Sequence, residues 1–243
     1  TVRALHIGTL DSKGDMVPAD NMDLGQLVWE FALRGDKEHR AIYGTPAVVD
    51  DVVYVGGYDG YLYVLTQKAD GDSSREPELI WQERIGREPD KKASPIVASP
   101  VVAGGLVLVA SSDGFLYAYD RVEQSEVWRF QTKDRIWSTP TVYQGVVYFG
   151  SLDKNLYAVS LEDGTELWRY SMKGAVASSP VVSEGTVFVG SFDATFYALN
   201  ANTGLLEWSF EGASNWFWGD PIVHQGIILS PSLDGNLYAL DAD

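Results

Sequence analysis

Short runs of apolar and β-branched residues, separated by polar turn residues, recur along the whole chain. Between residues 178 and 210, four such runs occur, at 178–182, 186–191, 196–199 and 205–210. Each run has the length and composition of a β-strand, and the breaks are rich in Gly, Asn, Asp and Ser. No window shows sustained helical periodicity. The pattern therefore predicts an all-β protein built from short strands.

A block of about forty residues repeats these runs, and fixed landmarks identify each copy. In five copies a Pro is followed thirteen residues later by an Asp: Pro46/Asp59, Pro100/Asp113, Pro140/Asp153, Pro180/Asp193 and Pro221/Asp234. A Tyr stands four residues after each Asp, and a Trp stands fifteen residues after three of them, at Trp128, Trp168 and Trp208. Four strands per copy at this period are typical of a β-propeller blade.

The loop before the Trp carries a more specific motif. Residues 200–208 read Asn-x-x-Thr-Gly-x-x-x-Trp, and Gly164 likewise stands four residues before its Trp, whereas Gln124 replaces that Gly in another copy. The motif resembles the tryptophan-docking motif of the PQQ-like (quinoprotein-type) β-propeller repeat. The resemblance implies four-stranded antiparallel blades whose large apolar residues pack against the next blade. In such a repeat protein, residues that break the pattern are the candidates for function.

Incomplete copies stand at both ends of the repeat. We expect the first copy to form its second strand within residues 5–11, its third within 16–20 and its fourth within 27–31, and we expect the last copy to lack its fourth strand. About six repeats, four full and two partial, with about twenty-two strands, then make one propeller domain over residues 1–243. The chain is either six blades closed imperfectly or an arc of a seven- or eight-bladed ring, which fits the family better.

Composition excludes several classes of function. The formal net charge is −16, so nucleic acid is not an expected partner, because phosphate binding requires clustered Lys and Arg. The acidity serves solubility, or it favours a basic protein or a divalent cation. The chain has no Cys, its three His lack metal-ligand spacing, and no Gly-x-Ser-x-Gly or phosphate loop occurs. No apolar stretch approaches the roughly twenty residues that span a bilayer.

The five turn Asp residues allow two interpretations. Repeated carboxylates bind Ca²⁺ in some proteins. Asp59, Asp113 and Asp234, however, are each followed by Gly, and in such hairpin turns Asp bonds the nearby backbone while Gly supplies positive φ. We therefore expect these carboxylates to be structural and predict no metal site.

Aromatic residues that do not repeat are the candidates for binding. Three residues before the landmark Pro stand Tyr43, Trp137 and Trp218, where other copies have Val or Ala. The last copy adds Asn215, Trp216 and Asp220, and Asp220 replaces a Ser or Thr. These residues begin innermost strands, so they either plug a narrow channel or contact a peptide or small molecule at its mouth.

Two insertions, at residues 35–40 and 86–93, join a fourth strand to the next first strand. Because strand direction alternates within a blade, these loops share a face with the Asp turns and the aromatic residues. Loops elaborated on a rigid scaffold often carry binding sites. In these insertions Arg40, Arg87 and Lys92 would supply local positive charge on that face.

The resemblance implies two classes of function. Dehydrogenases of this family use pyrroloquinoline quinone (PQQ) and have adjacent cysteines beside the cofactor, which this chain lacks. BamB-like members are non-catalytic, lie outside the cytoplasm and act in outer-membrane protein assembly. We therefore expect a non-catalytic scaffold that binds a protein or extended peptide, without PQQ or calcium and without catalytic residues. A PQQ-dependent dehydrogenase domain, or the ligand-sensing propeller of a larger receptor or kinase, is the alternative.

Overall fold

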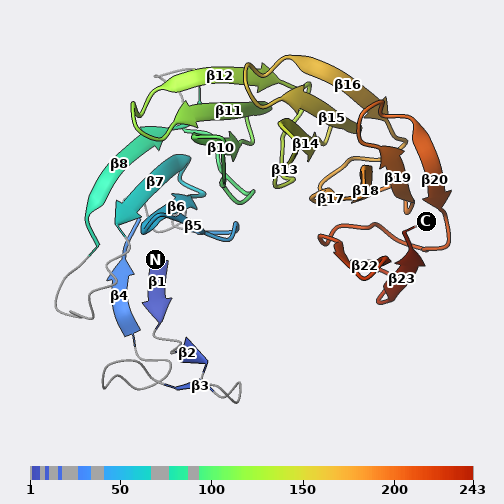
Figure 1. Ribbon diagram of the computed structural model, residues 1–243, viewed down its shortest axis with the longest axis horizontal. Coiled ribbons are helices and arrows are strands. Elements are labelled where there is room, and N and C mark those ends of the chain that lie inside the picture. The colour runs from blue at the N-terminus through green and yellow to red at the C-terminus, as the bar shows by residue number, and fades with distance from the viewer. Residues whose placement is uncertain are drawn as a thin grey trace.

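Radially arranged β-sheets make up the fold. The computed structural model describes residues 2–5, 9–10, 16–17, 27–33, 41–66, 77–86 and 93–242. These residues form twenty-three β-strands and no helix. Figure 1 shows the sheets as an open arc, with β5, β13 and β17 on its inner side and β8, β12, β16 and β20 along its outer rim. The prediction of an all-β propeller with four-stranded antiparallel blades is confirmed.

Five blades follow one another along the arc, and consecutive strands pair in order within each. Blade 1 contains β5 (Ala47–Val49), β6 (Val52–Gly56), β7 (Tyr61–Thr66) and β8 (Leu79–Arg84). Blade 2 contains β9 (Val101–Ala103), β10 (Leu106–Ala110), β11 (Phe115–Asp120) and β12 (Glu126–Gln131). Blade 3 contains β13 (Thr141–Tyr143), β14 (Val146–Gly150), β15 (Asn155–Ser160) and β16 (Glu166–Ser171). Blade 4 contains β17 (Val181–Ser183), β18 (Thr186–Gly190), β19 (Phe196–Asn200) and β20 (Leu206–Phe210), and blade 5 contains β21 (Ile222–His224), β22 (Ile227–Pro231) and β23 (Leu237–Asp241).

The first copy differs from the arrangement that the sequence predicts. Strand β1 (Val2–Leu5) pairs with β4 (Leu27–Phe31), and the short β2 (Thr9–Leu10) pairs with β3 (Met16–Val17). Ala4 of β1 lies opposite Trp29 of β4, and a bulge follows Ala4. The third and fourth strands of blade 2 pair in the same register, with Ala118 opposite Trp128 and a bulge after Ala118. The third strand is therefore β1, and the prediction of a second strand within 5–11 and a third within 16–20 is wrong. A long-range register decides this pairing, and local composition does not reveal it.

The hydrophobic core lies between the blades. One cluster joins Leu116 and Trp128 of blade 2 to Val147 and Phe149 of blade 3, and similar clusters fill the junctions on either side. Phe149 is fully buried. Burying one such side chain stabilises the fold by about 1.5–3 kcal/mol. Each blade therefore depends on its neighbours for most of its core.

A chain of hydrogen bonds also follows the inner side of the arc. The backbone N–H of Thr45 donates to Ser99 Oγ (2.8 Å), that of Ser99 to Thr139 Oγ1 (3.0 Å), and that of Thr139 to Ser179 Oγ (2.9 Å). The N–H of Ser179 donates in turn to Asp220 Oδ1 (2.7 Å). Each blade thus donates to a side chain of the next blade at an equivalent position.

Candidate partner-binding face

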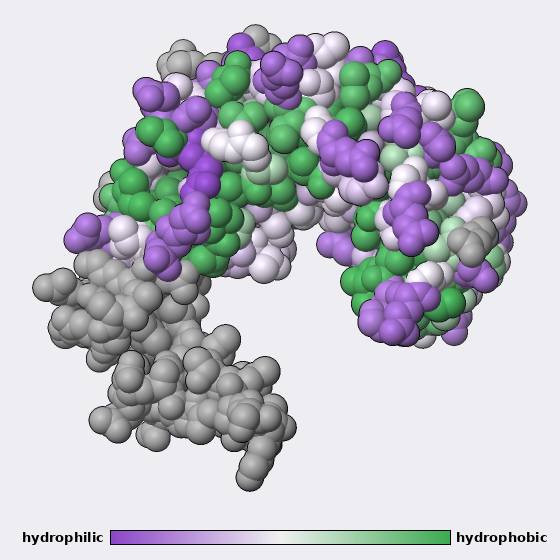
Figure 2. Space-filling model, in the orientation of Figure 1, coloured by the Kyte–Doolittle hydropathy of each residue, from purple (hydrophilic) through white to green (hydrophobic). Residues whose placement is uncertain are grey.

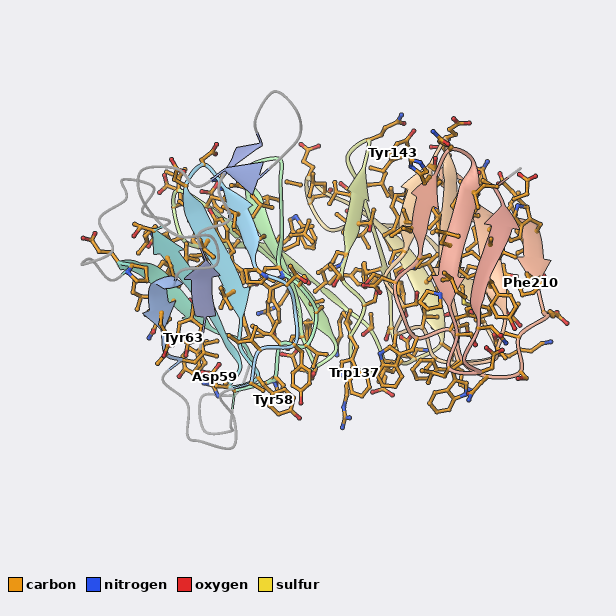
Figure 3. All side chains as sticks on the ribbon, turned by 90° about the horizontal axis from the view of Figure 1, so that it is seen from below. Tyr58, Asp59, Tyr63, Trp137, Tyr143 and Phe210 are labelled. Atoms are coloured by element: carbon orange, nitrogen blue, oxygen red, sulfur yellow. The ribbon has the colours of Figure 1, made fainter. Side chains whose placement is uncertain are left out.

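One end of every blade carries the turns between second and third strands, together with the segments that lead into the first strands. These parts are bonded to each other: the N–H of Tyr58 donates to Ala41 O, and the N–H of Leu233 to Trp216 O, each at 2.9 Å. Figure 3 shows Tyr58 and Trp137 at this edge of the arc and Tyr143 at the opposite edge. We call the edge with Tyr58 and Trp137 the aromatic face.

The turn Asp residues of this face are engaged in bonds within the fold. Asp153 Oδ2 accepts the Tyr157 hydroxyl (2.7 Å) and the N–H of Lys133 (2.9 Å), while Oδ1 accepts the N–H of Asn155 (3.1 Å). Burial raises the pKa of Asp153, but these bonds outweigh it and the pKa is lowered. The other turn Asp residues also accept the hydroxyl of the Tyr four residues on: Asp59, Asp113, Asp193 and Asp234. Each turn Asp therefore has a structural role as a hydrogen-bond acceptor within the fold.

Four aromatic side chains form one cluster across this face. The ring centroids of Trp137 and Trp218 are 6.1 Å apart, those of Trp218 and Phe192 are 5.2 Å apart, and those of Phe192 and Trp216 are 4.4 Å apart. The last pair is nearly parallel, with an interplanar angle of 9°. Trp216 and Trp218 are each 43% exposed. We call these four residues the aromatic cluster; it joins blades 3, 4 and 5.

Local contacts hold the cluster in place. Phe217 points inward and is fully buried, so the alternation along this extended segment turns Trp216 and Trp218 outward. Asn215 fixes the segment, since its Oδ1 accepts the N–H of Trp216 at 2.8 Å. Trp137 Nε1 donates to Ser112 Oγ of blade 2 at 3.3 Å. The aromatic surface is therefore ordered before any partner arrives.

The structure brings together some of the residues predicted for the site and separates others. Trp137, Trp216 and Trp218 meet, whereas Tyr43 pairs with Tyr58 in blade 1, with centroids 5.3 Å apart. Asp220 does not break the repeat as expected, because its carboxylate replaces the Ser or Thr oxygen in the chain of bonds between blades. Three predicted residues lie outside the described residues: Arg40, Arg87 and Lys92.

Sequence reasoning missed Phe192 and Arg135. Phe192 occupies the position just before the turn Asp, where the copies read Tyr58, Ser112, Leu152, Phe192 and Leu233. Comparing that position between copies would have revealed the aromatic exceptions. Arg135 lies over the Trp137 ring, 6.0 Å from its centroid, and adds a cation to the cluster.

Charge is divided unequally between the two faces. The aromatic face carries exposed cations in its loops and turns, at Lys133, Arg135, Lys154 and Lys173, and exposed carboxylates at Asp134 and Glu211. The opposite face carries exposed carboxylates, which belong to Asp50, Asp51, Glu123, Glu162, Asp163 and Glu184. Figure 2 shows hydrophilic side chains over much of one side of the arc, with hydrophobic side chains exposed between them.

The described residues give two further results. They contain no helix of the length and apolarity needed to cross a membrane. Within the same part of the chain, no group of three or more His, Cys, Asp or Glu is placed to hold a metal ion.

Known structures share this architecture. The structure of BamB from Moraxella catarrhalis aligns with a TM-score of 0.70 and 19% identity, over 90% of this chain and 63% of that one. Quinohemoprotein alcohol dehydrogenase from Comamonas testosteroni aligns with a TM-score of 0.67 and 18% identity, over 84% of this chain and 42% of that one. The computationally designed Ika4 protein aligns with a TM-score of 0.57 and 18% identity, over 65% of this chain and all of its own. At these identities the likeness shows the fold.

Sequence comparison gives the family. No curated protein sequence matches the chain. A family model described as "Outer membrane protein assembly factor BamB" matches residues 72–177 and 152–243, which together make up more than half of the chain. The chain spans less than two thirds of the BamB structure that it resembles. On the strength of the family match and the blade architecture, the chain belongs to the BamB family of PQQ-like repeat β-propellers.

Proposed function

We propose that this chain is a non-catalytic propeller scaffold that binds a protein or an extended peptide through its aromatic face. The aromatic cluster is the observation that carries the proposal, because Trp216 and Trp218 are exposed, mutually ordered by Phe192 and flanked by Arg135 beside Trp137. Trp, Tyr and Arg are the residue types most enriched in interface hot spots. A cluster that is already ordered loses little side-chain entropy on binding.

The family match supports a more specific role. The family is described as an outer membrane protein assembly factor. We propose that this chain also acts in the assembly of outer membrane proteins and that it lies outside the cytoplasm. Exposed cations around the cluster, such as Lys133 and Lys173, offer local contacts to carboxylates of a partner segment. Such contacts act mainly on the rate of association, and they weaken at high salt.

A quinone enzyme is the alternative that the shared fold raises. PQQ is a carboxylate-bearing quinone, and its use with calcium requires a set of oxygen donors for the metal. Among the described residues, no three His, Cys, Asp or Glu side chains are placed to hold a metal ion, and the Asp220 carboxylate accepts the N–H of Ser179. These residues do not fit the cofactor, so we assign no chemical step to it and propose that the chain functions without PQQ or calcium.

Site-specific crosslinking tests the binding face. A photoreactive phenylalanine analogue is placed at Trp216 or Trp218 of the protein in its native host, and at Leu205 as the matched control. Leu205 is 68% exposed and lies in a loop between third and fourth strands, on the opposite face. We expect a discrete polypeptide adduct from positions 216 and 218 and none from 205. An adduct from 205 alone would move the interface to the opposite face.

Two further measurements separate the scaffold from the enzyme. The Trp216→Ala/Trp218→Ala protein should keep its melting temperature and lose the partner at least tenfold, since each 1.4 kcal/mol of lost contact is tenfold in affinity. Added PQQ and Ca²⁺ should produce no dye-linked oxidation of alcohols or glucose. Stoichiometric PQQ binding with turnover would overturn the scaffold proposal.

A further inference from the structure

Docking of a Trp onto the next blade follows one geometry at two junctions. Trp128 Nε1 donates to Leu161 O in blade 3, and Trp168 Nε1 donates to Ala201 O in blade 4, both at 2.9 Å. Each indole lies directly on a glycine, because a Cβ added at Gly164 would come within 2.6 Å of the Trp128 ring. Docking in this geometry therefore requires a residue without a side chain beneath the ring.

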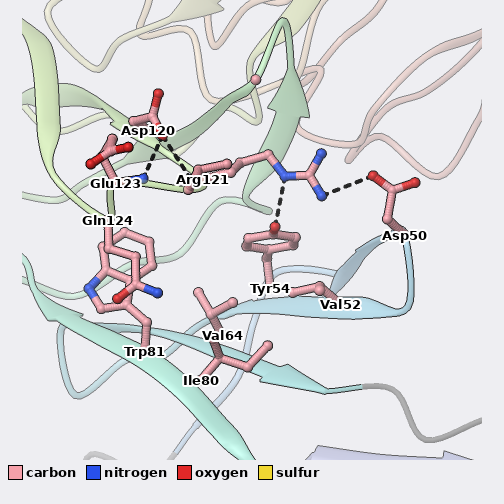
Figure 4. A pocket seen from close by; sticks show the side chains of 12 residues that line it. Asp50, Val52, Tyr54, Val64, Ile80, Trp81, Asp120, Arg121, Glu123 and Gln124 are labelled. Atoms are coloured by element: carbon pink, nitrogen blue, oxygen red, sulfur yellow. Dashed lines mark hydrogen bonds and ion pairs between the residues drawn. The ribbon is translucent and has the colours of Figure 1, made fainter.

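The junction between blades 1 and 2 lacks that glycine. Gln124 occupies its place, with a left-handed φ of 54°, and Trp81 is the docking residue. The bonds between described residues include none from the Trp81 indole to the carbonyl of Arg121, which is the equivalent acceptor. Trp81 instead meets Tyr119 edge to face, with centroids 5.6 Å apart. A cavity of about 430 Å³ opens beside it, between the two blades (Figure 4).

Other departures from the repeat meet at the same cavity. Arg121 stands where blades 3 and 4 have Leu161 and Ala201, and its Nε donates to the Tyr54 hydroxyl (2.9 Å) while Nη2 pairs with Asp50 (3.1 Å). The turn at Asp50 and Asp51 holds both residues at positive φ, 51° and 59°. The other blades place Gly at the second of these positions: Gly105, Gly145, Gly185 and Gly226. Strained backbone of this kind collects at ligand sites, and here it coincides with an open space.

The lining of the cavity determines what it can bind. Val64 and Ile80 form an apolar wall next to Trp81, and the rim carries Asp120 and Glu123. The positive charge of Arg121 is matched by Asp50, so the two rim carboxylates leave the cavity with a negative charge. Asp120 is held in place by the N–H groups of Val122 (2.7 Å) and Glu123 (2.8 Å). A ligand for this space therefore needs an apolar stem and a cationic end.

We propose that the cavity between blades 1 and 2 binds a basic side chain, lysine or arginine, of a partner polypeptide. The aliphatic stem packs on Ile80 and Val64 while the charged end lies between Glu123 and the Trp81 ring, because long basic side chains bury their stems and aromatic faces attract cations. The volume is within the range of small-ligand sites. The site lies on the acidic face, opposite the aromatic cluster, so it is independent of the proposed function.

Nuclear magnetic resonance of the full chain tests the site with defined probes. Nα-acetyl-lysinamide and Nα-acetyl-argininamide are titrated while the indole N–H resonance of Trp81, identified with Trp81→Phe, is followed. The neutral Nα-acetyl-norleucinamide has nearly the same stem and lacks the charge. We expect saturable shifts with the two cations and at least tenfold weaker binding of norleucinamide. Putrescine distinguishes a free diamine from a side chain: binding tighter than that of the lysine probe would assign the site to a free amine and overturn the polypeptide partner.

Two variants test the site directly. Gln124→Gly restores the glycine of the other junctions, so Trp81 should dock, the cavity should close and lysine-probe binding should fall at least tenfold. Glu123→Gln removes one rim charge without changing the backbone and should weaken binding about threefold. Equal binding of norleucinamide, full binding by Gln124→Gly, or no shift of Trp81 with any probe would each overturn the site.

Discussion

The junction between blades 2 and 3 and the junction between blades 1 and 2 use the same positions of the repeat with opposite results. In the first, Gly164 admits the Trp128 indole, which is only 8% exposed and is bonded to the next blade. In the second, Gln124 occupies that place, and Trp81 becomes one wall of a cavity. Replacing a single glycine thus turns a packing contact into a recess. In a repeat protein, a site can arise from the loss of a structural residue as well as from the gain of a reactive one.

The largest difference should appear when the docking Trp is removed. Trp128→Ala should lower the free energy of unfolding by about 3–5 kcal/mol, the range for a large buried aromatic residue. Trp168→Ala should cost somewhat less, because Trp168 makes the same hydrogen bond but is only half-buried. Trp81→Ala should cost less, because Trp81 lacks the hydrogen bond worth about 0.5–1.5 kcal/mol and borders empty space. Denaturant unfolding of the three variants measures this. Equal losses would mean that Trp81 is docked after all.

The second-largest effect is expected when a side chain is added beneath the docked Trp at the junction between blades 2 and 3. Gly164→Gln should destabilise by about 1–3 kcal/mol, because its Cβ would overlap the Trp128 ring. Gly145→Gln is the matched control, since Gly145 also has a positive φ (79°) but has no atom within 4 Å of a Cβ. Gly145→Gln should therefore lose only the free energy that a left-handed φ costs a residue with a side chain. The comparison fails if both variants unfold at the same denaturant concentration.

The reverse change should have a smaller, stabilising effect. Gln124→Gly relieves a left-handed residue, which costs roughly 1–2 kcal/mol for a side chain that is not glycine, and lets Trp81 donate to the next blade. The greater chain entropy of Gly in the unfolded state offsets part of this gain, so we expect a net increase of about 1 kcal/mol. The Trp81 indole resonance should move as its hydrogen bond forms. A less stable protein with an unmoved resonance would contradict the comparison.

Lowering the pH should have the smallest effect on stability, and the effect should be limited to the loops between third and fourth strands that contain Asp120 and Asp163. Backbone bonds from Glu123 and Val122 lower the pKa of Asp120, and a bond from the N–H of Thr165 lowers that of Asp163 at the equivalent loop of blade 3. A depressed pKa contributes stability above the unfolded value, near 3.9, and that stability is lost as the pH falls through the folded value. The Val122 and Glu123 amide resonances should therefore shift below about pH 4, and Asp120→Asn should abolish this shift. Titration of those amides at the ordinary pKa of an Asp carboxyl, near 3.9, would contradict the prediction.

Much of the fold could be predicted from the sequence because the landmark Asp, Tyr and Trp residues make equivalent contacts in successive copies. Each turn Asp accepts the hydroxyl of its Tyr, and Trp168 docks on Gly204 as the motif predicts. The strand order of the first copy was not predicted. The strand that pairs with Leu27–Phe31 is β1, whose Ala4 lies opposite Trp29, and the hairpin of β2 and β3 is inserted between these two strands. Composition alone cannot reveal such a choice.

The candidate site was predictable only where a residue differs from the residues at the equivalent position of the other copies. Trp137, Trp216 and Trp218 stand out in this way. Phe192 also differs from most copies at its position, but its contact with Trp216 comes from another blade, so its place in the cluster depends on how the blades pack together. The structural bond of Asp220 was not predicted, because the N–H group that it accepts belongs to the preceding blade.

The chain of bonds along the inner side of the arc gives every blade a polarity. One flank of a blade supplies N–H donors and the other supplies oxygen acceptors, from Thr45 through Asp220. Contacts of this head-to-tail kind are heterologous, and the rotation between neighbours sets the number of units that closes a ring. The hydrogen bond itself is the same at every junction, so it does not by itself determine the number of blades. Gene duplication can add a copy to such a protein, and the new copy meets complementary flanks on both sides without any change in its neighbours.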